Sequence, residues 1–140
     1  MEESMGEGFF YGLYMDPDLL KGLKYSPHNP RIAYVEDYQL DLRGVAKMIP
    51  QQGSKTWGMV IQLSQADLDQ MYGSEATKSY QPETMTAILQ DGQAVQTACY
   101  NLPPDQSAEL NRMYGFKLLA ILKKLSLPAD YIWEVEGMLK

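Results

Sequence analysis

The stretch that decides the fold is TWGMVIQLSQADLDQMYG, residues 56–73. Its first half has apolar side chains at every second position, namely Trp57, Met59, Ile61 and Leu63. This period of two is typical of a strand with one buried face. Ser64 follows as a candidate helix cap, with Asp67 three residues later in the pattern of a capping box. The stretch therefore predicts a strand that leads directly into a short helix. Gly58 inside the strand predicts a bulge or the close approach of another backbone.

Further strands and helices are predicted before and after this stretch. Aromatic residues at 8–12 predict a short buried strand, and alternating apolar residues at 32–42 predict a longer one. Runs at 85–89 and 94–100 flank Asp91-Gly92, which predicts a hairpin. The pattern also predicts a turn at residues 50–53, a helix at 17–22 that Asp16 caps, and two C-terminal helices over residues 110–125 and 131–139. Because strands come first and helices last, we expect an α+β fold with the strand that ends near Tyr11 central and the 110–125 helix packed on the sheet.

Length and charge narrow the classes of protein. The 140 residues predict a single domain over 1–140, with residues 1–7 expected to be flexible. A net charge of -6 disfavours a nucleic acid partner, and no apolar run approaches the ~20 residues of a membrane span. Cys99 is the only cysteine, so no intrachain disulfide can form, and we expect a cytoplasmic protein.

Most kinds of reactive site are not indicated by the sequence. One histidine and one cysteine do not make a metal cluster, and no glycine-rich phosphate loop is present. We therefore expect no metal and no cofactor. His28 is interpreted as a solvated loop residue, and Cys99 as a small buried thiol rather than a nucleophile.

Three segments in a particular order carry a resemblance to a known family. They are FFYGLYM at residues 9–15, the stretch at 56–73, and LSLPADY at 125–131. Together they resemble the gamma-glutamylcyclotransferase-like (AIG2-like) family of small cytosolic enzymes. The resemblance implies a small mixed, largely antiparallel, partly closed β-barrel with C-terminal helices packed outside and a pocket at one end. It also implies a small-molecule substrate of the gamma-glutamyl type, and leaves a homodimer open.

The resemblance implies a binding loop after the first strand. In the family, backbone N–H groups of a short loop hold the alpha-carboxylate end of a gamma-glutamyl group. The residues that take this place here are Tyr11, Gly12, Leu13, Tyr14 and Met15. Glycine allows close approach of a ligand to the backbone. Leu13 stands where the family usually has serine or threonine, so one hydroxyl group of the site is missing.

The family's catalytic residue is a glutamate just after the helix of the 56–73 stretch. It takes a proton from the substrate's alpha-amine, which attacks the gamma-carbonyl to give 5-oxoproline. In this chain Tyr72 stands in that register, and Glu75 follows three residues later. Either a small insertion moves the acid to Glu75, or the acid is lost and Glu75 is a solvated loop residue. Glu83 and Glu36 are lesser candidates, of which Glu36 interrupts an apolar face and could point inward. Tyr72 and Tyr80 are expected to border the pocket.

Three function classes therefore stay open. The first is a cyclotransferase-like enzyme with Glu75 as its base. The second is a non-catalytic small-molecule-binding module on the same scaffold, with Tyr72 in the catalytic position. The third is a structural or interaction protein, for which nine methionines and many tyrosines would suit a hydrophobic partner.

Overall fold

Five strands pair around a closed barrel in the order β1-β3-β2-β4-β5 in the computed structural model, which describes residues 5–44, 46–73, 81–101 and 108–140. The strands are β1 (Met5–Phe10), β2 (His28–Asp41), β3 (Lys47–Ser64), β4 (Gln81–Leu89) and β5 (Ala94–Asn101). Neighbours are antiparallel, except that β1 and β5 run parallel and close the barrel through the pair Gly8 and Ala98. This confirms the predicted α+β class and the largely antiparallel barrel. Residues 5–7, expected to be flexible, pair with β3.

The long strand β3 organises the barrel because it pairs with both β1 and β2. The turn predicted at residues 50–53 was wrong, since β3 continues through them. Instead, the register of the β2–β3 ladder shifts between Glu36 and Tyr38, and the Gly53 N–H donates to Asp37 Oδ1 at 3.0 Å. The turn-forming residues are therefore accommodated as an irregularity that bends two paired strands.

The seam between β1 and β3 explains the glycine inside the strand. A Cβ atom built on Gly58 would lie 2.2 Å from the Phe10 carbonyl oxygen and 3.1 Å from Phe9 Cζ. Such contacts are far inside van der Waals distance, so a side chain at position 58 would push the two strands apart. The predicted close backbone approach at Gly58 is confirmed.

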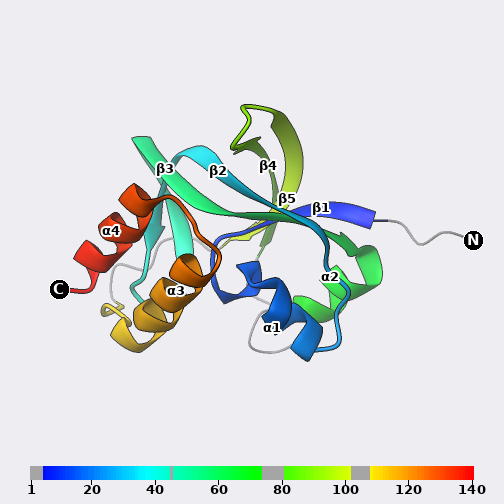
Figure 1. Ribbon diagram of the computed structural model, residues 1–140, viewed down its shortest axis with the longest axis horizontal. Helices are drawn as coiled ribbons and strands as arrows, with labels where there is room; N and C mark the ends of the chain where they lie inside the picture. Colours follow the sequence, from blue (N-terminus) through cyan, green and yellow to red (C-terminus); the bar gives the residue numbers. More distant parts are fainter. Residues whose placement is uncertain (1–4, 45, 74–80, 102–107) are drawn as a thin grey trace, which may run out of the picture.

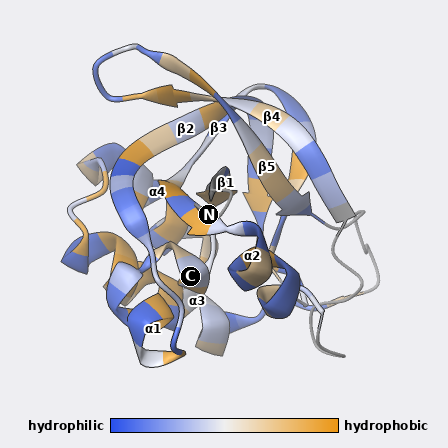
Figure 2. Ribbon diagram, turned by 90° about the vertical axis from the view of Figure 1, so that its right-hand side faces the viewer, coloured by the Kyte–Doolittle hydropathy of each residue, from blue (hydrophilic) through white to orange (hydrophobic). Residues whose placement is uncertain are grey.

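The helices lie outside the barrel (Figure 1). They are the 3-10 helix η1 (Leu13–Met15), α1 (Pro17–Gly22), α2 (Gln65–Met71), α3 (Arg112–Lys124) and α4 (Ala129–Met138). Figure 1 shows α3 and α4 together on one side and α1 and α2 on another. Leu118 and Leu122 of α3 are buried, as the C-terminal pattern predicts, whereas Met113 of the same pattern is exposed. Figure 2 shows both hydrophilic and hydrophobic stretches along β2 and β5. In β5 burial alternates at the end of the strand, where Thr97, Cys99 and Asn101 are buried and their neighbours are only partly buried.

Side-chain caps start the two short helices. Asp16 Oδ1 accepts the Asp18 N–H at 3.1 Å at the start of α1, and Ser64 Oγ accepts the Asp67 N–H at 3.1 Å at the start of α2. Both predicted caps are confirmed. The Asp67 carboxylate accepts the Ser26 N–H at 3.0 Å, which ties α2 to the segment after α1. No helix in the described part of the chain is long and apolar enough to cross a membrane.

Candidate functional site

The predicted binding loop follows β1 directly and is held from α3. The Leu13 N–H donates to the Tyr114 hydroxyl oxygen at 3.1 Å. A Cβ atom on Gly12 would lie 2.3 Å from the same oxygen, so only glycine leaves room for this hydroxyl. Within the loop, the Met15 N–H donates to the Gly12 carbonyl at 3.0 Å and closes η1. The Asp16 N–H also donates to the Leu13 carbonyl at 3.2 Å, so the loop is fixed by local backbone bonds and by one bond to α3.

Three tyrosines bring the loop, the end of α2 and the end of β5 together. The ring of Tyr72, the residue that follows α2, stacks on Tyr100 of β5 with centroids 3.8 Å apart and planes 7° apart. The ring of Tyr14 meets Tyr72 edge to face, with centroids 6.2 Å apart and planes at 88°. All three rings are half-buried. The residue in the register of the family's acid therefore lies beside the predicted binding loop, with its ring in aromatic contacts.

The phenols around the loop remain protonated at neutral pH. Burial raises the pKa of Tyr14, and the neighbouring Tyr25 adds to the effect. Burial likewise raises the pKa of Tyr100, with the charge of Asp69 acting in the same direction. For Tyr114, burial raises the pKa more than the bond from the Leu13 N–H lowers it. These groups can donate hydrogen bonds, but they are poor proton acceptors.

The side chain of Tyr11 is buried and belongs to a hydrogen-bond network inside the barrel. Its hydroxyl donates to Asn101 Oδ1 at 3.1 Å and lies 3.2 Å from the Tyr100 carbonyl oxygen. Asn101 also accepts the Met48 N–H at 2.9 Å and donates to the Met48 carbonyl at 2.8 Å. Asn101 thus links the start of β3 to the end of β5 beneath the loop. Sequence reasoning missed this residue, because an asparagine two residues before the pair Pro103-Pro104 looks like an ordinary loop residue.

A second polar group lies at the connection between β2 and β3. The Asp41 carboxylate accepts from Arg43 Nε at 3.1 Å and from Arg43 Nη2 at 3.0 Å, and Lys47 Nζ lies 3.9 Å from it. Burial pushes the pKa of Asp41 upward, but the bonds from Arg43 and the charge of Lys47 outweigh it and hold the pKa below its usual value. The Lys47 side chain is almost fully buried, and its ammonium group also donates to the Arg43 carbonyl. Paired charges are thus built into the barrel close to Met48, the partner of Asn101.

The other predicted residues are placed as follows. Glu75 and Tyr80 lie outside the described residues. The side chain of Met15 is fully buried in the core, so this residue could meet a ligand only through its backbone. Glu36 is exposed, so the expectation that it points inward was wrong, and Glu83 is exposed as well. Among the described residues no three histidine, cysteine, aspartate or glutamate side chains gather closely enough to hold a metal ion.

Cys99 and His28 have no part in this site. Cys99 is fully buried in β5, and burial, with the charge of Glu83 in addition, raises the pKa of its thiol far above the usual range. This confirms a buried thiol rather than a nucleophile. His28 is exposed, although it is the first residue of β2 rather than part of the predicted loop.

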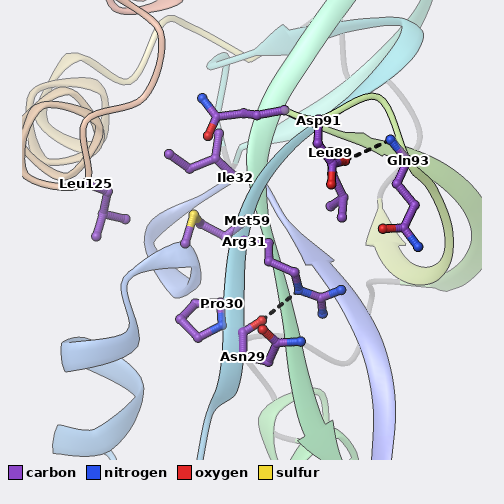
Figure 3. A pocket seen from close by; sticks show the side chains of 10 residues that line it. Asn29, Pro30, Arg31, Ile32, Met59, Leu89, Asp91, Gln93 and Leu125 are labelled. Carbon is purple, nitrogen blue, oxygen red and sulfur yellow. Dashed lines mark hydrogen bonds between the residues drawn. The ribbon is translucent and has the colours of Figure 1, made fainter.

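A cavity of about 640 Å³ lies elsewhere, between β2 and the β4–β5 turn (Figure 3). Its lining includes none of the predicted site residues. The side chains of Ile32, Met59, Leu89 and Leu125 form its apolar part, and Arg31 at its edge is ion-paired with Glu7. Arg31 is the one cationic residue among the described residues of this lining, and it is already paired, so the cavity offers no free charge to bind an anionic ligand. The end of the barrel lined by Tyr14, Tyr72 and Tyr100, called here the tyrosine-lined end, is therefore the better candidate site.

Comparison with known proteins identifies the family of this chain. The family model described as "Gamma-glutamyl cyclotransferase, AIG2-like" matches residues 8–116, which include the loop, β3, α2 and the first turn of α3. The chain belongs to this family. A search of curated proteins found none that matches this AIG2-like chain.

Solved structures show the same fold at low sequence identity. A structure named "Gamma-glutamyl cyclotransferase" superposes with a TM-score of 0.82 at 17% identity, covering 95% of this chain and 87% of that one. An uncharacterized protein from Homo sapiens gives a TM-score of 0.81 at 20% identity, covering 96% and 88%. An AIG2-like protein from Mus musculus gives 0.56 at 17% identity, covering 77% and 89%. At such low identities these similarities establish the fold of this chain and nothing about its activity.

Proposed function

We propose that this protein is a gamma-glutamylcyclotransferase-like enzyme that cleaves a gamma-glutamyl amide. The alpha-amine nitrogen of the substrate attacks its own gamma-carbonyl carbon, the amide C–N bond breaks, the leaving amine takes up a proton, and 5-oxoproline is released. The contact between Tyr14 and Tyr72, at 6.2 Å between ring centroids, is the observation that carries this proposal. It brings the loop expected to hold the substrate next to the helix end after which the family carries its acid.

The substrate's alpha-carboxylate would lie at the loop after Gly12. The Tyr114 hydroxyl holds this loop by accepting the Leu13 N–H, and the Tyr11 hydroxyl is anchored to Asn101 and the Tyr100 carbonyl. The rings of Tyr14, Tyr72 and Tyr100 would line the space beside the scissile amide. They offer apolar surface that restricts water, which favours charge interactions within the site.

Glu75 would supply the proton transfer. Three peptide units separate it from Tyr72, and fully extended they span at most about 11 Å. The neighbourhood of the aromatic contact is therefore within reach of its carboxylate. A glutamate has an unperturbed pKa of about 4.3 that rises on burial, whereas a phenol near ~10 is a poor base at pH 7. Since burial raises the pKa of Tyr14 and Tyr100 further, neither can take the place of the carboxylate.

Amine release from a panel of gamma-glutamyl dipeptides, with 5-oxoproline measured in parallel, tests this proposal. For the best substrate, Glu75→Gln should lower kcat by about 10²–10⁴, because this is the usual effect of losing a general base. The matched control is Tyr72→Phe, which keeps the stacked ring and should lower kcat far less. Full activity of Glu75→Gln on the best substrate would contradict the assignment of the base.

A second candidate is a binding module without catalysis on the same scaffold. It is favoured by the Tyr72 ring, which stands in the register of the acid and is stacked on Tyr100 at 3.8 Å. An apolar ring in this place would close off the position from which a carboxylate acts. Binding of gamma-glutamyl dipeptides with no 5-oxoproline released from any of them would support this candidate over the enzyme.

A further inference from the structure

Exposed apolar side chains gather on the two C-terminal helices. Among the described residues, four large apolar side chains are exposed, and three of them, Met113, Phe116 and Trp133, lie on α3 and α4. Their exposed fractions are 72%, 56% and 76%, whereas the fourth, Leu23, stands alone at the end of α1. A single exposed apolar residue is ordinary, but a group of them on neighbouring elements marks a contact surface.

The two helices that carry these side chains lie side by side at one edge of the molecule (Figure 1). A Cβ atom built on Gly115 would lie 2.2 Å from Leu139 Cδ2, and Arg112 Nε donates to the Leu139 carbonyl at 3.3 Å. The start of α3 therefore touches the end of α4. Because residues 125–128 alone connect them, the two helices run in opposite directions.

The outer sides of both helices are apolar. Met113, Phe116 and Ala120 follow one another at spacings of three and four, so they lie on the same side of α3, and all three are exposed. On α4, Val135 is fully buried, and the exposed Trp133 lies about 160° around the helix from it. The surface formed by Met113, Phe116, Ala120 and Trp133 is called here the α3–α4 face.

The charges beside this face differ between the two helices. Every charged residue of α3 is basic, and every charged residue of α4 is acidic. Lys124 is paired with Asp16 and Asp18, but among the described residues no ion pair involves the exposed Lys117 of α3 or Glu134 of α4. A partner for this face must therefore offer apolar surface, acidic charge opposite α3 and basic charge opposite α4.

A second copy of the chain has this combination. If a two-fold axis runs parallel to the helices between the two faces, α3 of each copy lies on α4 of the other, and each contact between opposite charges occurs twice. A two-fold axis across the helices would instead place α3 on α3 and α4 on α4, where like charges repel. We propose that two copies of the chain associate through the α3–α4 face in the first arrangement. This association is independent of the proposed reaction.

Lys117 and Glu134 are the charges expected to meet at the rim. The two helices touch through Gly115 and Leu139, and Lys117 and Glu134 lie about 160° and about 140° around their helices from these residues. Both are therefore remote from the neighbouring helix of their own chain. In the proposed arrangement the outer edge of α3 adjoins the outer edge of α4 of the other copy, which brings Lys117 of one copy to Glu134 of the other.

The size of the face predicts a reversible dimer. Helices of 13 and 10 residues are about 20 and about 15 Å long and lie about 10 Å apart, so the face covers roughly 400 Å² in outline. A standard interface buries about 800 Å² on each partner. We therefore expect the dimer to dissociate in the micromolar range of concentration.

Sedimentation velocity of the full chain, at concentrations from low to high micromolar, tests the association. The mass should rise from that of one chain to that of two. Trp133→Ala should raise the dissociation constant about thirtyfold or more, as expected for an aromatic residue that anchors an interface. The control Leu23→Ala removes an exposed apolar side chain outside the face and should leave the dissociation constant unchanged.

Charge reversal tests how the two copies are arranged. Lys117→Glu and Glu134→Lys should each raise the dissociation constant about fivefold or more, because each substitution brings like charges together at both symmetric positions. The variant with both substitutions has opposite charges across the interface again and should associate nearly as tightly as the unaltered chain. Circular dichroism checks that each variant is folded.

Three results would overturn the proposal. A chain that stays monomeric at every concentration has no such interface, whichever other protein the face binds. A dimer that Trp133→Ala leaves as tight as before associates through another surface. If the variant with both charge reversals associates no better than the single variants, α3 does not lie on α4 of the other copy.

Discussion

Two regions of the barrel differ in how closely they follow the family's pattern. One is the seam where β1 pairs with β3, and the other is the tyrosine-lined end. At the seam, Gly58 stands where the barrel requires a residue without a side chain. A Cβ atom at this position would lie 2.2 Å from the Phe10 carbonyl oxygen. At the barrel end, Leu13 and Tyr72 replace the hydroxyl residue and the acid that the family pattern has there. Closing a barrel requires correct volumes and register, whereas a reaction requires particular functional groups. Membership of the AIG2-like family therefore establishes the barrel fold, whereas the reaction remains to be tested.

The seam offers the largest expected effect. Gly58→Ala should lower the free energy of unfolding by about 3 kcal/mol, at the upper end of the usual cost of overpacking, because the atoms in the way belong to the backbone of β1 and cannot rotate aside. Chemical denaturation followed by circular dichroism measures this change. The control is Gly137→Ala in α4, where a Cβ meets nothing within 4 Å, and there we expect a stabilisation of up to about 1 kcal/mol. Equal effects of the two substitutions would show that the seam is not tightly constrained.

The barrel end should respond in activity rather than in stability. In the Glu75→Gln background, Tyr72→Glu returns a carboxylate to the family's usual register beside Tyr14. We expect kcat on the best gamma-glutamyl substrate to rise at least tenfold above that of Glu75→Gln alone, as part of the ~10²–10⁴ that a general base contributes. Tyr72→Gln in the same background is the control, since it has nearly the same shape without a basic oxygen. If Tyr72→Glu and Tyr72→Gln give the same kcat in this background, a carboxylate at position 72 does not contribute to catalysis.

The smallest effect is expected at Asp41, the last residue of β2. The pKa of Asp41 is lower in the folded protein than its unfolded value of about 3.9, so its stabilising contribution is present above pH 4 and is lost as the pH falls through the folded pKa. The unfolding midpoint of the unaltered chain should therefore decrease below pH 4. Asp41→Asn, less stable at pH 7, should show a shallower decrease over the same range. Parallel curves for the two proteins would indicate that other carboxylates cause the acid dependence.

Much of the fold could be predicted because it depends on local patterns. The strand at residues 57–63, the caps at Asp16 and Ser64, and the hairpin at Asp91-Gly92 all appear in the structure. The single buried face predicted for residues 57–63 was wrong, since Met59, Val60 and Ile61 are all buried. The failure at residues 50–53 has a physical reason. A proline and a glycine permit a turn but do not require one. The pairs of Pro50 with Tyr38 and of Lys55 with Glu36, on either side of residues 51–54, keep the segment within β3.

The candidate site was predicted only in part, and for a different reason. The loop at Gly12 and the importance of position 72 could be inferred from the sequence through the resemblance. Tyr114 and Asn101 could not, because they act over separations of 101 and 53 residues in the chain. A hydrogen bond to a distant backbone group has no periodic pattern that would mark it.

The sequence determined the order of the elements, the absence of a side chain at Gly58 and, through the resemblance, the departures from the family's pattern at positions 13 and 72. It did not determine the buried face of β2, where Ala33 and Val35 are buried rather than Ile32 and Tyr34. Only the tertiary structure decided that a hydroxyl returns to the loop from α3 and that the ring of Tyr72 packs between Tyr14 and Tyr100. Local periodicity follows from backbone geometry, which neighbouring residues share. Contacts between groups of η1, the end of α2, β5 and α3 depend instead on how the barrel closes, and closure is a property of the whole chain.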